Sequence, residues 1–293
     1  MPQLKRQRTK TLKVKDNGRS ADYVTPNFIY GCLGGCRDSY CYVMRYNHDK
    51  VFINENTDQI LGKVEQHVVN LDWPKTANQT DPEFYTYDIG CSTDIGLHWK
   101  HYDWQDVFTY FRDHPRAKAT FATKYVNEKM LDFNPSGKVR IRFSLMPQNM
   151  SDVVEPRTSK IADRIAAIPK FIEAGYDVHL NFSPIVFCEG WLDDYRELFE
   201  QVAAVVTDPT HRAMVQAEAI MVTHNPWQHK RNLEAGMTES EALLWRPDIQ
   251  EYKRSGYGSS AVRYKRNFKA DLCEEWLAVH DEVIPWNTVR YLF

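Results

Sequence analysis

From about residue 23 to residue 225, the sequence alternates between short strand-like runs and segments with helical periodicity. Strands are expected at residues 28–30, 84–89, 117–123, 139–143, 178–186 and 214–223. Helices are expected at residues 56–73, 103–112, 127–131, 160–174 and 192–206. Strands separated by helices pair in parallel through right-handed crossovers. The alternation therefore predicts an α/β protein whose core, residues 23–225, is a partial (β/α)6 TIM-type barrel.

The two ends of the chain depart from this alternation. The first 20 residues contain seven Lys or Arg and one Asp, so residues 1–22 are expected to form a basic tail. Such a tail is usually solvated, and the alternative is an arm that contacts an anionic or protein partner. Residues 226–293 are expected to form a C-terminal extension. Its predicted elements are a short helix at 239–245, a β-hairpin at 252–266 around a Gly-rich turn, and a last helix at 270–281.

The overall composition restricts the class of protein. The chain has 293 residues, 43% of them apolar, and a formal charge of −2. These values indicate a globular protein and argue against one that coats nucleic acid over its whole surface. The sequence contains no apolar run of about 18 residues and no secretory signal. We therefore expect no membrane association and a cytoplasmic location.

Three of the six cysteines lie within ten residues, as Cys32, Cys36 and Cys41. In a chain without an export signal, this clustering favours a metal site over disulfides. Three thiolates on one loop can hold three irons of a [4Fe–4S] cluster and leave the fourth iron open to another ligand. The alternatives are three buried thiols, or a zinc site with Cys91 as the fourth ligand. Cys188 and Cys273 are expected to be core thiols.

Several polar residues follow the ends of successive predicted strands. Cys32, Cys91 and Lys124 follow the first three strands, and Ser144 ends the fourth. Ligands of parallel α/β sheets bind at the carboxyl ends of the strands. We therefore expect these residues to lie around one binding site.

The cysteine loop resembles that of the radical S-adenosylmethionine superfamily, whose commonest spacing is C-x3-C-x2-C, although here two extra residues separate Cys36 from Cys41. Further segments are similar to spore photoproduct lyase and its splicease-like relatives, in the same order along the chain. These segments are 31–36, 40–42, 91–95, 140–145, 155–159, 174–176, 183–185, 189–191, 195–199 and 252–258.

The resemblance implies a function for nine residues. It implies that Cys32, Cys36 and Cys41 bind a [4Fe–4S] cluster, and that Tyr42, Thr93, Lys124 and Ser144 contact S-adenosylmethionine. It also implies that Cys91 returns a hydrogen atom to the product radical, and that Tyr40 relays the resulting radical. An external electron donor is required. The expected reaction is the cleavage of a C–C bond by a 5′-deoxyadenosyl radical.

Two substrates are compatible with this resemblance. We favour a ribosomally made precursor peptide, from which a splicease-like enzyme excises tyramine, with a small peptide-recognition protein as an optional partner. Three features favour the peptide over DNA: only 31 residues precede Cys32, the total charge is slightly acidic, and the cysteine loop is wider than in the DNA-repair enzyme. The alternative is repair of a thymine dimer in duplex DNA, contacted by the basic and aromatic hairpin at 252–266. A further alternative is a non-catalytic iron–sulfur or zinc protein.

Overall fold

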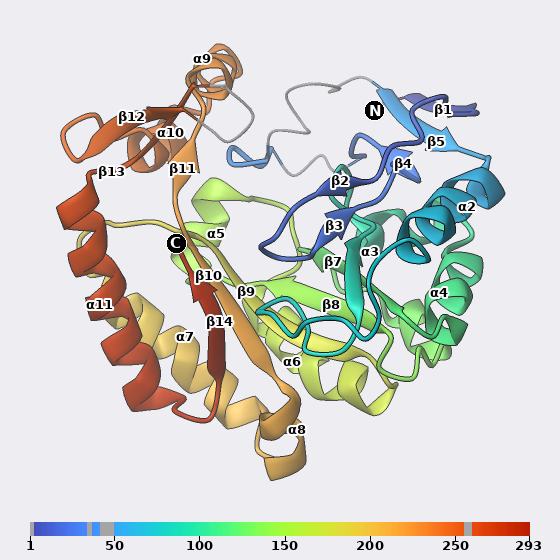
Figure 1. Ribbon diagram of the computed structural model, residues 1–293. Helices are drawn as coiled ribbons and strands as arrows, with labels where there is room; N and C mark the ends of the chain where they lie inside the picture. The colour runs from blue at the N-terminus through green and yellow to red at the C-terminus, as the bar shows by residue number, and fades with distance from the viewer. Residues whose placement is uncertain (1–2, 34–36, 42–49, 255–259) are drawn as a thin grey trace.

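The computed structural model describes residues 3–33, 37–41, 50–254 and 260–293. Its centre is a curled eight-stranded sheet in the order β14-β10-β9-β8-β7-β6-β3-β2 (Figure 1). Six neighbouring strands of this sheet, from β3 to β10, run parallel and form the partial (β/α)6 barrel that the sequence predicts. These are β3 (Tyr23–Val24), β6 (Tyr85–Asp88), β7 (Ala117–Thr123), β8 (Val139–Ser144), β9 (Asp177–Ile185) and β10 (Gln216–Met221).

Amphipathic helices cover the outer face of the sheet. In α4 (Trp104–Asp113), the buried residues Trp104, Val107, Phe108 and Phe111 form one stripe, and Phe108 stacks on Phe121 of β7 with ring centroids 5.9 Å apart. The other covering helices are α2 (Thr57–Val68), α6 (Ile161–Glu173), α7 (Trp191–Val205) and α11 (Arg266–Val283). Shorter helices are α3 (Ile95–His98), η1 (Trp99–His101), η2 (Glu128–Asp132), α5 (Gln148–Val154) and α8 (Pro209–Met214).

The amino-terminal region differs from the expectation. The first barrel strand is β3 rather than residues 28–30, because β4 (Ile29–Tyr30) pairs antiparallel with β5 (Lys50–Asn54) in a separate small sheet. The expected tail is not simply solvated: β1 (Gln3–Gln7) pairs in parallel with β5, and β2 (Lys15–Asp16) pairs with β3. All side chains of β1 are exposed, so no hydrophobic pattern in the sequence reveals this strand.

The C-terminal extension contains the expected hairpin, formed by β12 (Gln250–Arg254) and β13 (Ser260–Tyr264). The hairpin joins β11 (Thr223–His224), and two helices precede it: α9 (Pro226–Glu234), which the sequence analysis missed, and α10 (Thr238–Leu244). The last strand, β14 (Thr288–Leu292), was also missed. Because β14 pairs in parallel with β10, the end of the extension completes the core sheet.

The interior of the barrel is charged, and the charges are paired. Arg142 donates to Asp88 at 2.7 Å and to Glu218 at 2.8 Å, so that it connects β8 with β6 and β10. Arg140, two residues earlier on the same face of β8, contacts Asp81 and Asp177. Burying ionised groups is costly unless each is paired and hydrogen-bonded. The alternating pattern at 139–143 therefore marks a strand buried on both faces rather than one with a solvent face.

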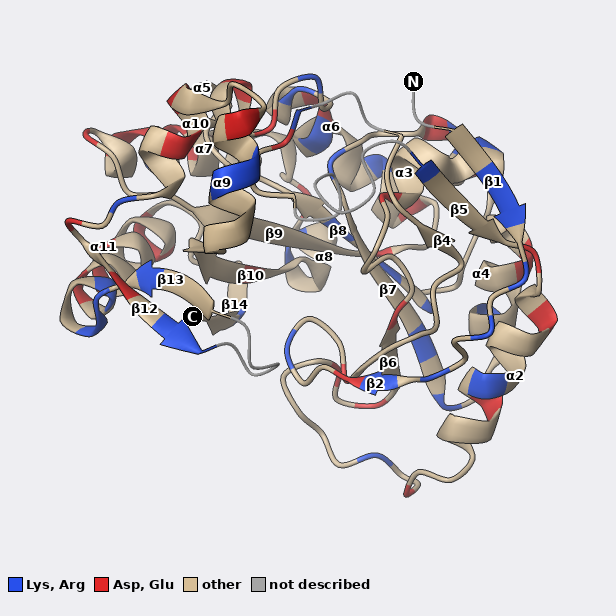
Figure 2. Cartoon of the chain, turned by 90° about the horizontal axis from the view of Figure 1, so that it is seen from above, with Lys and Arg blue, Asp and Glu red and all other residues tan. Residues whose placement is uncertain are grey.

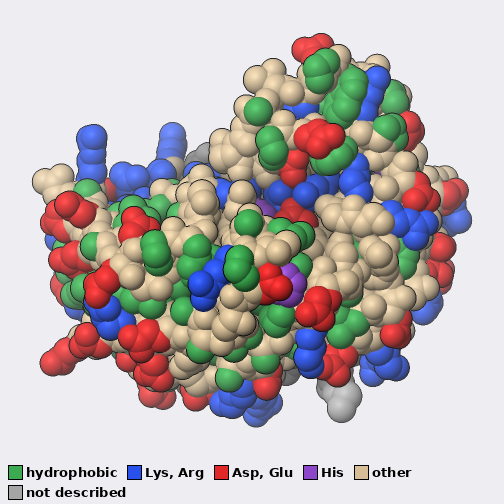
Figure 3. All heavy atoms as spheres, turned by 90° about the horizontal axis from the view of Figure 1, so that it is seen from below, with side chains coloured by type: hydrophobic (Ala, Val, Ile, Leu, Met, Phe, Trp, Pro, Cys, Tyr) green, Lys and Arg blue, Asp and Glu red, His purple; other side chains and the backbone are tan. Residues whose placement is uncertain are grey.

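The end of the barrel at which the strands begin lies on the face shown in Figure 3, where acidic, basic and hydrophobic side chains are interspersed. Within the described ranges, no helix has the length and apolar character needed to cross a membrane. The carboxyl ends of the strands lie on the opposite face, seen from above in Figure 2.

We expect Arg142→Met to destabilise the protein by about 3–5 kcal/mol, because it leaves the Asp88 carboxylate buried without its cation and leaves Glu218 paired with Arg290 alone. The measurement is urea unfolding followed by circular dichroism. The matched control is Arg196→Met, which breaks an exposed ion pair with Glu282 and should cost less than about 1 kcal/mol. Equal and small losses in both variants would contradict the role of the buried pair.

Candidate active site

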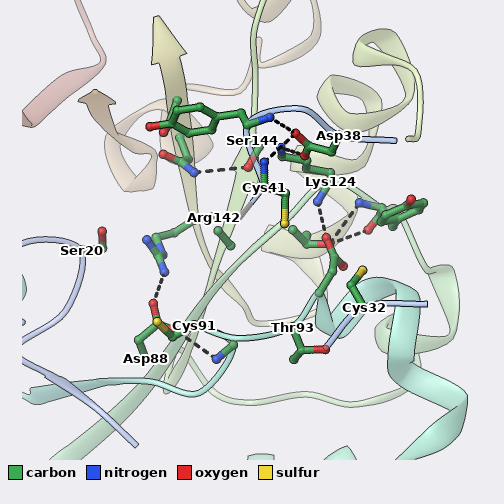
Figure 4. Close-up of a pocket in the computed structure, with 18 of the residues that line it drawn as sticks. Ser20, Cys32, Asp38, Cys41, Asp88, Cys91, Thr93, Lys124, Arg142 and Ser144 are labelled. Carbon is green, nitrogen blue, oxygen red and sulfur yellow. Dashed lines mark hydrogen bonds and ion pairs between the residues drawn. The ribbon is translucent and has the colours of Figure 1, made fainter. Parts of the chain in front are cut away.

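A cavity of about 390 Å³ opens at the carboxyl ends of the barrel strands (Figure 4). This volume is typical of a small-molecule or cofactor site. The cavity brings together all the predicted site residues that the structure describes, namely Cys32, Tyr40, Cys41, Cys91, Thr93, Lys124 and Ser144. The two remaining predicted residues, Cys36 and Tyr42, lie outside the described residues.

Gly31 directs the chain from β4 into the cysteine loop. Its φ angle is +103°, and a Cβ atom there would lie 2.7 Å from the Lys50 carbonyl oxygen, so only glycine fits. The Gly31 N–H donates to the Ser92 carbonyl at 3.0 Å. This bond holds Cys32 close to the loop that follows β6 and carries Cys91 and Thr93.

Asp38 organises the second half of the described cysteine loop. Its Oδ1 accepts from the backbone N–H groups of Tyr40 and Cys41 at 2.9 and 3.0 Å, which forms a local turn. Its Oδ2 pairs with the ammonium of Lys124 at the end of β7. Asp38 therefore couples the position of Cys41 to that of Lys124.

The ammonium of Lys124 is held between two buried carboxylates. Besides Asp38, it contacts Glu155 Oε2 at 2.8 Å, and Glu155 also pairs with Arg164 at 2.7 Å. Burial alone would lower the pKa of Lys124, but Asp38 and Glu155 raise it well above its ordinary value. Lys124 is therefore a permanent cation at the cavity wall, although part of its charge is already compensated by the protein.

Thr93 is connected to the cysteine loop through a buried histidine. His98 Nε2 accepts from the Leu33 N–H at 3.0 Å, so its Nδ1 carries the proton and donates to Thr93 Oγ1 at 2.5 Å. Burial lowers the pKa of His98 to about 4, which keeps the ring neutral. The Thr93 hydroxyl is thus left with its own hydrogen to offer to a ligand in the cavity.

Cys91 lies at the cavity on the side of the paired charges. Asp88 Oδ1 accepts from the Gly90 N–H at 2.9 Å, while its Oδ2 pairs with Arg142. Figure 4 shows Cys91 beside Asp88, well separated from the sulfur atoms of Cys32 and Cys41. Cys91 therefore lies apart from the two described cysteines of the loop, although all three line one cavity.

The cysteine loop also packs against the C-terminal extension. The Ser39 carbonyl accepts from Gln228 at 2.7 Å and from Asn232 at 2.6 Å, and both donors lie on α9. Burial raises the pKa of Tyr40, although a hydrogen bond with Thr223 opposes the shift. The loop is therefore positioned by residues from both the barrel and the extension.

The sequence analysis missed four residues that hold the predicted ones in place. These are Asp38, Asp88, His98 and Glu155. A signal existed for Asp38, because an aspartate two residues before Tyr40 is typical of a side-chain-capped turn. The pairing of Glu155 with Lys124 had no sequence signal, since 31 residues separate them.

The donor set fits an iron–sulfur cluster and S-adenosylmethionine. Cys32 and Cys41 pack against each other on one loop, with Leu97 as their apolar neighbour. A cation and two hydroxyl groups, from Lys124, Thr93 and Ser144, line the same cavity. Thiolates suit iron, and the polar groups suit the charged and ribose parts of the nucleotide.

Comparison with known proteins identifies the family. The family model described as spore photoproduct lyase matches residues 6–293. The chain belongs to this family. It is a radical S-adenosylmethionine enzyme of the lyase class. The spore photoproduct lyase of Bacillus subtilis (strain 168) is 28% identical over 288 residues, covering 96% of this chain and 79% of the relative. The Clostridium acetobutylicum protein of the same name is 25% identical over 277 residues, covering 93% and 77%.

Solved structures of family members share the fold. A spore photoproduct lyase complexed with dinucleoside spore photoproduct superposes with a TM-score of 0.83 at 23% identity, covering 99% of this chain and 82% of that one. A variant with bound AdoMet and the same dinucleoside gives a TM-score of 0.86 at 23% identity, with the same coverage. The likeness confirms that this family member folds as a partial barrel.

We expect stability to fall as the pH is lowered from 6.5, the ordinary pKa of histidine, to about 4, the pKa of folded His98. In this pH window His98 is protonated in the unfolded chain but not in the folded protein. The free energy of unfolding therefore falls by roughly 3 kcal/mol in total. His98→Gln, which keeps an acceptor for the Leu33 N–H, should remove this part of the acid sensitivity. Urea unfolding at several pH values measures it, and an unchanged slope in the variant would contradict the prediction.

Proposed function

We propose that this enzyme is a DNA-repair lyase that reverses the spore photoproduct, a thymine dimer. The observation that carries the proposal is the position of Cys91, which lines the same cavity as Cys32 and Cys41 but lies on its other side. A thiol in that position can donate a hydrogen atom to a substrate radical held between it and the cofactor.

The comparisons favour DNA over the peptide that the sequence analysis preferred. The relatives described above are spore photoproduct lyases, and two of the solved structures hold a dinucleoside spore photoproduct. None of these proteins is named as a peptide-maturing enzyme, so nothing in them supports the splicease reading. The slightly acidic net charge that favoured a peptide is an average, which says little about local charge at the barrel opening.

The cofactors would be bound by the cysteine loop and the adjacent strand ends. Cys32, Cys36 and Cys41 would ligate a [4Fe–4S] cluster, and Tyr42, Thr93, Lys124 and Ser144 would contact S-adenosylmethionine. When bound and reduced by an external donor, this pair supplies a 5′-deoxyadenosyl radical that abstracts hydrogen from the substrate. Cys91 would then return a hydrogen atom, and Tyr40 would relay the radical away from the thiol.

Within the protein, three arrangements favour this chemistry. The Lys124 charge at the cavity wall favours a carboxylate ligand, and the neutral His98 orients the Thr93 hydroxyl. The Arg142–Asp88 pair holds the start of the Cys91 loop through Gly90. These contacts fix the donor thiol before substrate arrives, which limits the entropy lost in the reactive complex.

Exposed cations flank the barrel opening on two sides. Figure 2 shows Lys and Arg on the β12–β13 hairpin and on β1 and β2, with the strand ends between them. Lys253 and Arg254 are exposed at the end of β12, beside Tyr252, which is 71% exposed. Tyr264, an aromatic residue of the 252–266 hairpin that the sequence analysis expected to contact DNA, is instead buried and accepts from the Phe187 N–H. Tyr257 lies outside the described residues.

We expect Cys91→Ala to cleave S-adenosylmethionine but to lose at least tenfold in thymine recovered from DNA that contains the spore photoproduct. The reason is that the product radical lacks its hydrogen donor. The assay is chromatography of the anaerobic reaction of reconstituted enzyme. Cys32→Ala is the matched control and should abolish cofactor cleavage itself. Normal repair by Cys91→Ala would contradict the donor assignment, and turnover of a precursor peptide without DNA repair would contradict the proposed function.

We expect Lys253→Ala/Arg254→Ala to reduce the salt dependence of duplex DNA binding. Each lost phosphate contact lowers the slope of log K against log salt by about one, so the double variant should lose about two. Fluorescence anisotropy at several salt concentrations measures the slope. Lys160→Ala/Lys170→Ala, which removes two exposed cations at helix α6, is the control and should leave it unchanged. Equal slopes in both double variants would exclude the hairpin as a contact.

A further inference from the structure

Three potential metal ligands converge in the C-terminal extension, outside the active-site cavity. They are His224 at the end of β11, His229 on α9 and Glu241 on α10, and their ligand atoms all lie within 4.8 Å of one another. His224 Nε2 lies 3.0 and 3.1 Å from the two carboxylate oxygens of Glu241. His229 Nδ1 also contacts Glu241 Oε2. Both imidazole nitrogens therefore face the same carboxylate oxygen.

The surroundings of this cluster hold the ligands in orientation. His224 and Glu241 are buried, and the indole of Trp245 stacks on the His229 ring with centroids 4.3 Å apart and planes 11° apart. The amide of Asn232 donates to Glu241 Oε1, which leaves Oε2 directed at the two histidines. Outer hydrogen bonds and packing of this kind are characteristic of metal ligands, because they fix the ring and carboxylate orientations.

We propose that His224, His229 and Glu241 bind a zinc ion. Two imidazole nitrogens and one carboxylate are an established donor set for zinc, with water in the fourth position. Donors about 2.0–2.1 Å from a tetrahedral ion lie roughly 3.4 Å apart, so ligand atoms that all lie within 4.8 Å of one another can surround the ion after side-chain adjustments. His229 is partly exposed, and it provides the route by which zinc and the fourth ligand reach the site.

The position of the site indicates a structural role. Asn232, which donates to Glu241, also donates to the Ser39 carbonyl in the cysteine loop, and Gln228 donates to the same carbonyl. Arg37 of that loop donates to the carbonyl of Ala235, the residue that follows α9. An ion that connects β11, α9 and α10 therefore stabilises the surface on which the loop carrying Tyr40 and Cys41 rests.

The site is tested by measuring zinc and iron per chain in the same protein. Full-length enzyme is reconstituted anaerobically with iron and sulfide, incubated with zinc chloride, desalted and analysed by elemental mass spectrometry. We expect about one zinc per chain in the wild type and at least a tenfold loss in His229→Ala/Glu241→Gln. The matched control is His211→Ala, at a histidine of α8 outside the cluster, which should keep its zinc. Wild-type protein without zinc, or zinc retained by the double variant, would overturn the proposal.

A second variant separates this site from the cysteine loop and does not depend on the folding of the histidine variant. Cys32→Ala/Cys36→Ala/Cys41→Ala should lose iron and keep zinc, whereas loss of both metals would overturn the proposal.

The same variant is then loaded with cobalt in place of zinc. We expect d–d absorption without thiolate-to-cobalt charge transfer, and charge-transfer bands or failure to bind cobalt would contradict a nitrogen and oxygen site. These measurements do not involve DNA, so they stand or fall independently of the repair function.

Discussion

The paired charges inside the barrel are the constraint on which the active site depends. Arg142 pairs with Asp88 and with Glu218, which Arg290 also contacts, and so connects three parallel strands that lie far apart in the sequence. Charges buried in this way are tolerated only when their partners are in place, so the network specifies the strand positions as well as stabilising them. Because Asp88 also accepts from the Gly90 N–H, the same network sets where Cys91 begins. The charge pairs of the core therefore also determine the position of Cys91, the proposed hydrogen donor.

A second set of charges links the cysteine loop to the barrel. Asp38 accepts from two backbone N–H groups near Cys41 and pairs with Lys124, which Glu155 holds from its other side. The carboxylate of S-adenosylmethionine would have to compete with these two carboxylates for the Lys124 ammonium. Competition of this kind weakens binding of the ligand, but it also orients the Lys124 side chain in advance. The conformational entropy of that side chain is therefore lost during folding rather than during binding.

The extension is as much a part of the site as the barrel. Its strand β14 completes the core sheet, and α9 supports the Ser39 carbonyl next to Tyr40. The same segment carries the basic hairpin at the barrel opening and the His224–His229–Glu241 cluster. The proposed DNA contacts and the contacts that support the cysteine loop therefore lie on the same segment of the chain.

The sequence by itself predicted the barrel and seven of the residues that line the cavity. Period-2 and period-3.6 patterns are local, so β7, β8 and the helix ending at Gly175 were predictable, and parallel strands must bring Cys91, Lys124 and Ser144 to one edge. Only the tertiary structure decided the partners of those residues. The fully exposed strand β1, the Asp38–Lys124 pair and the histidine that links Thr93 to Leu33 depend on contacts between distant segments. No periodic sequence pattern predicts such contacts, because each depends on how whole helices and strands pack and not on the neighbouring residues in the sequence.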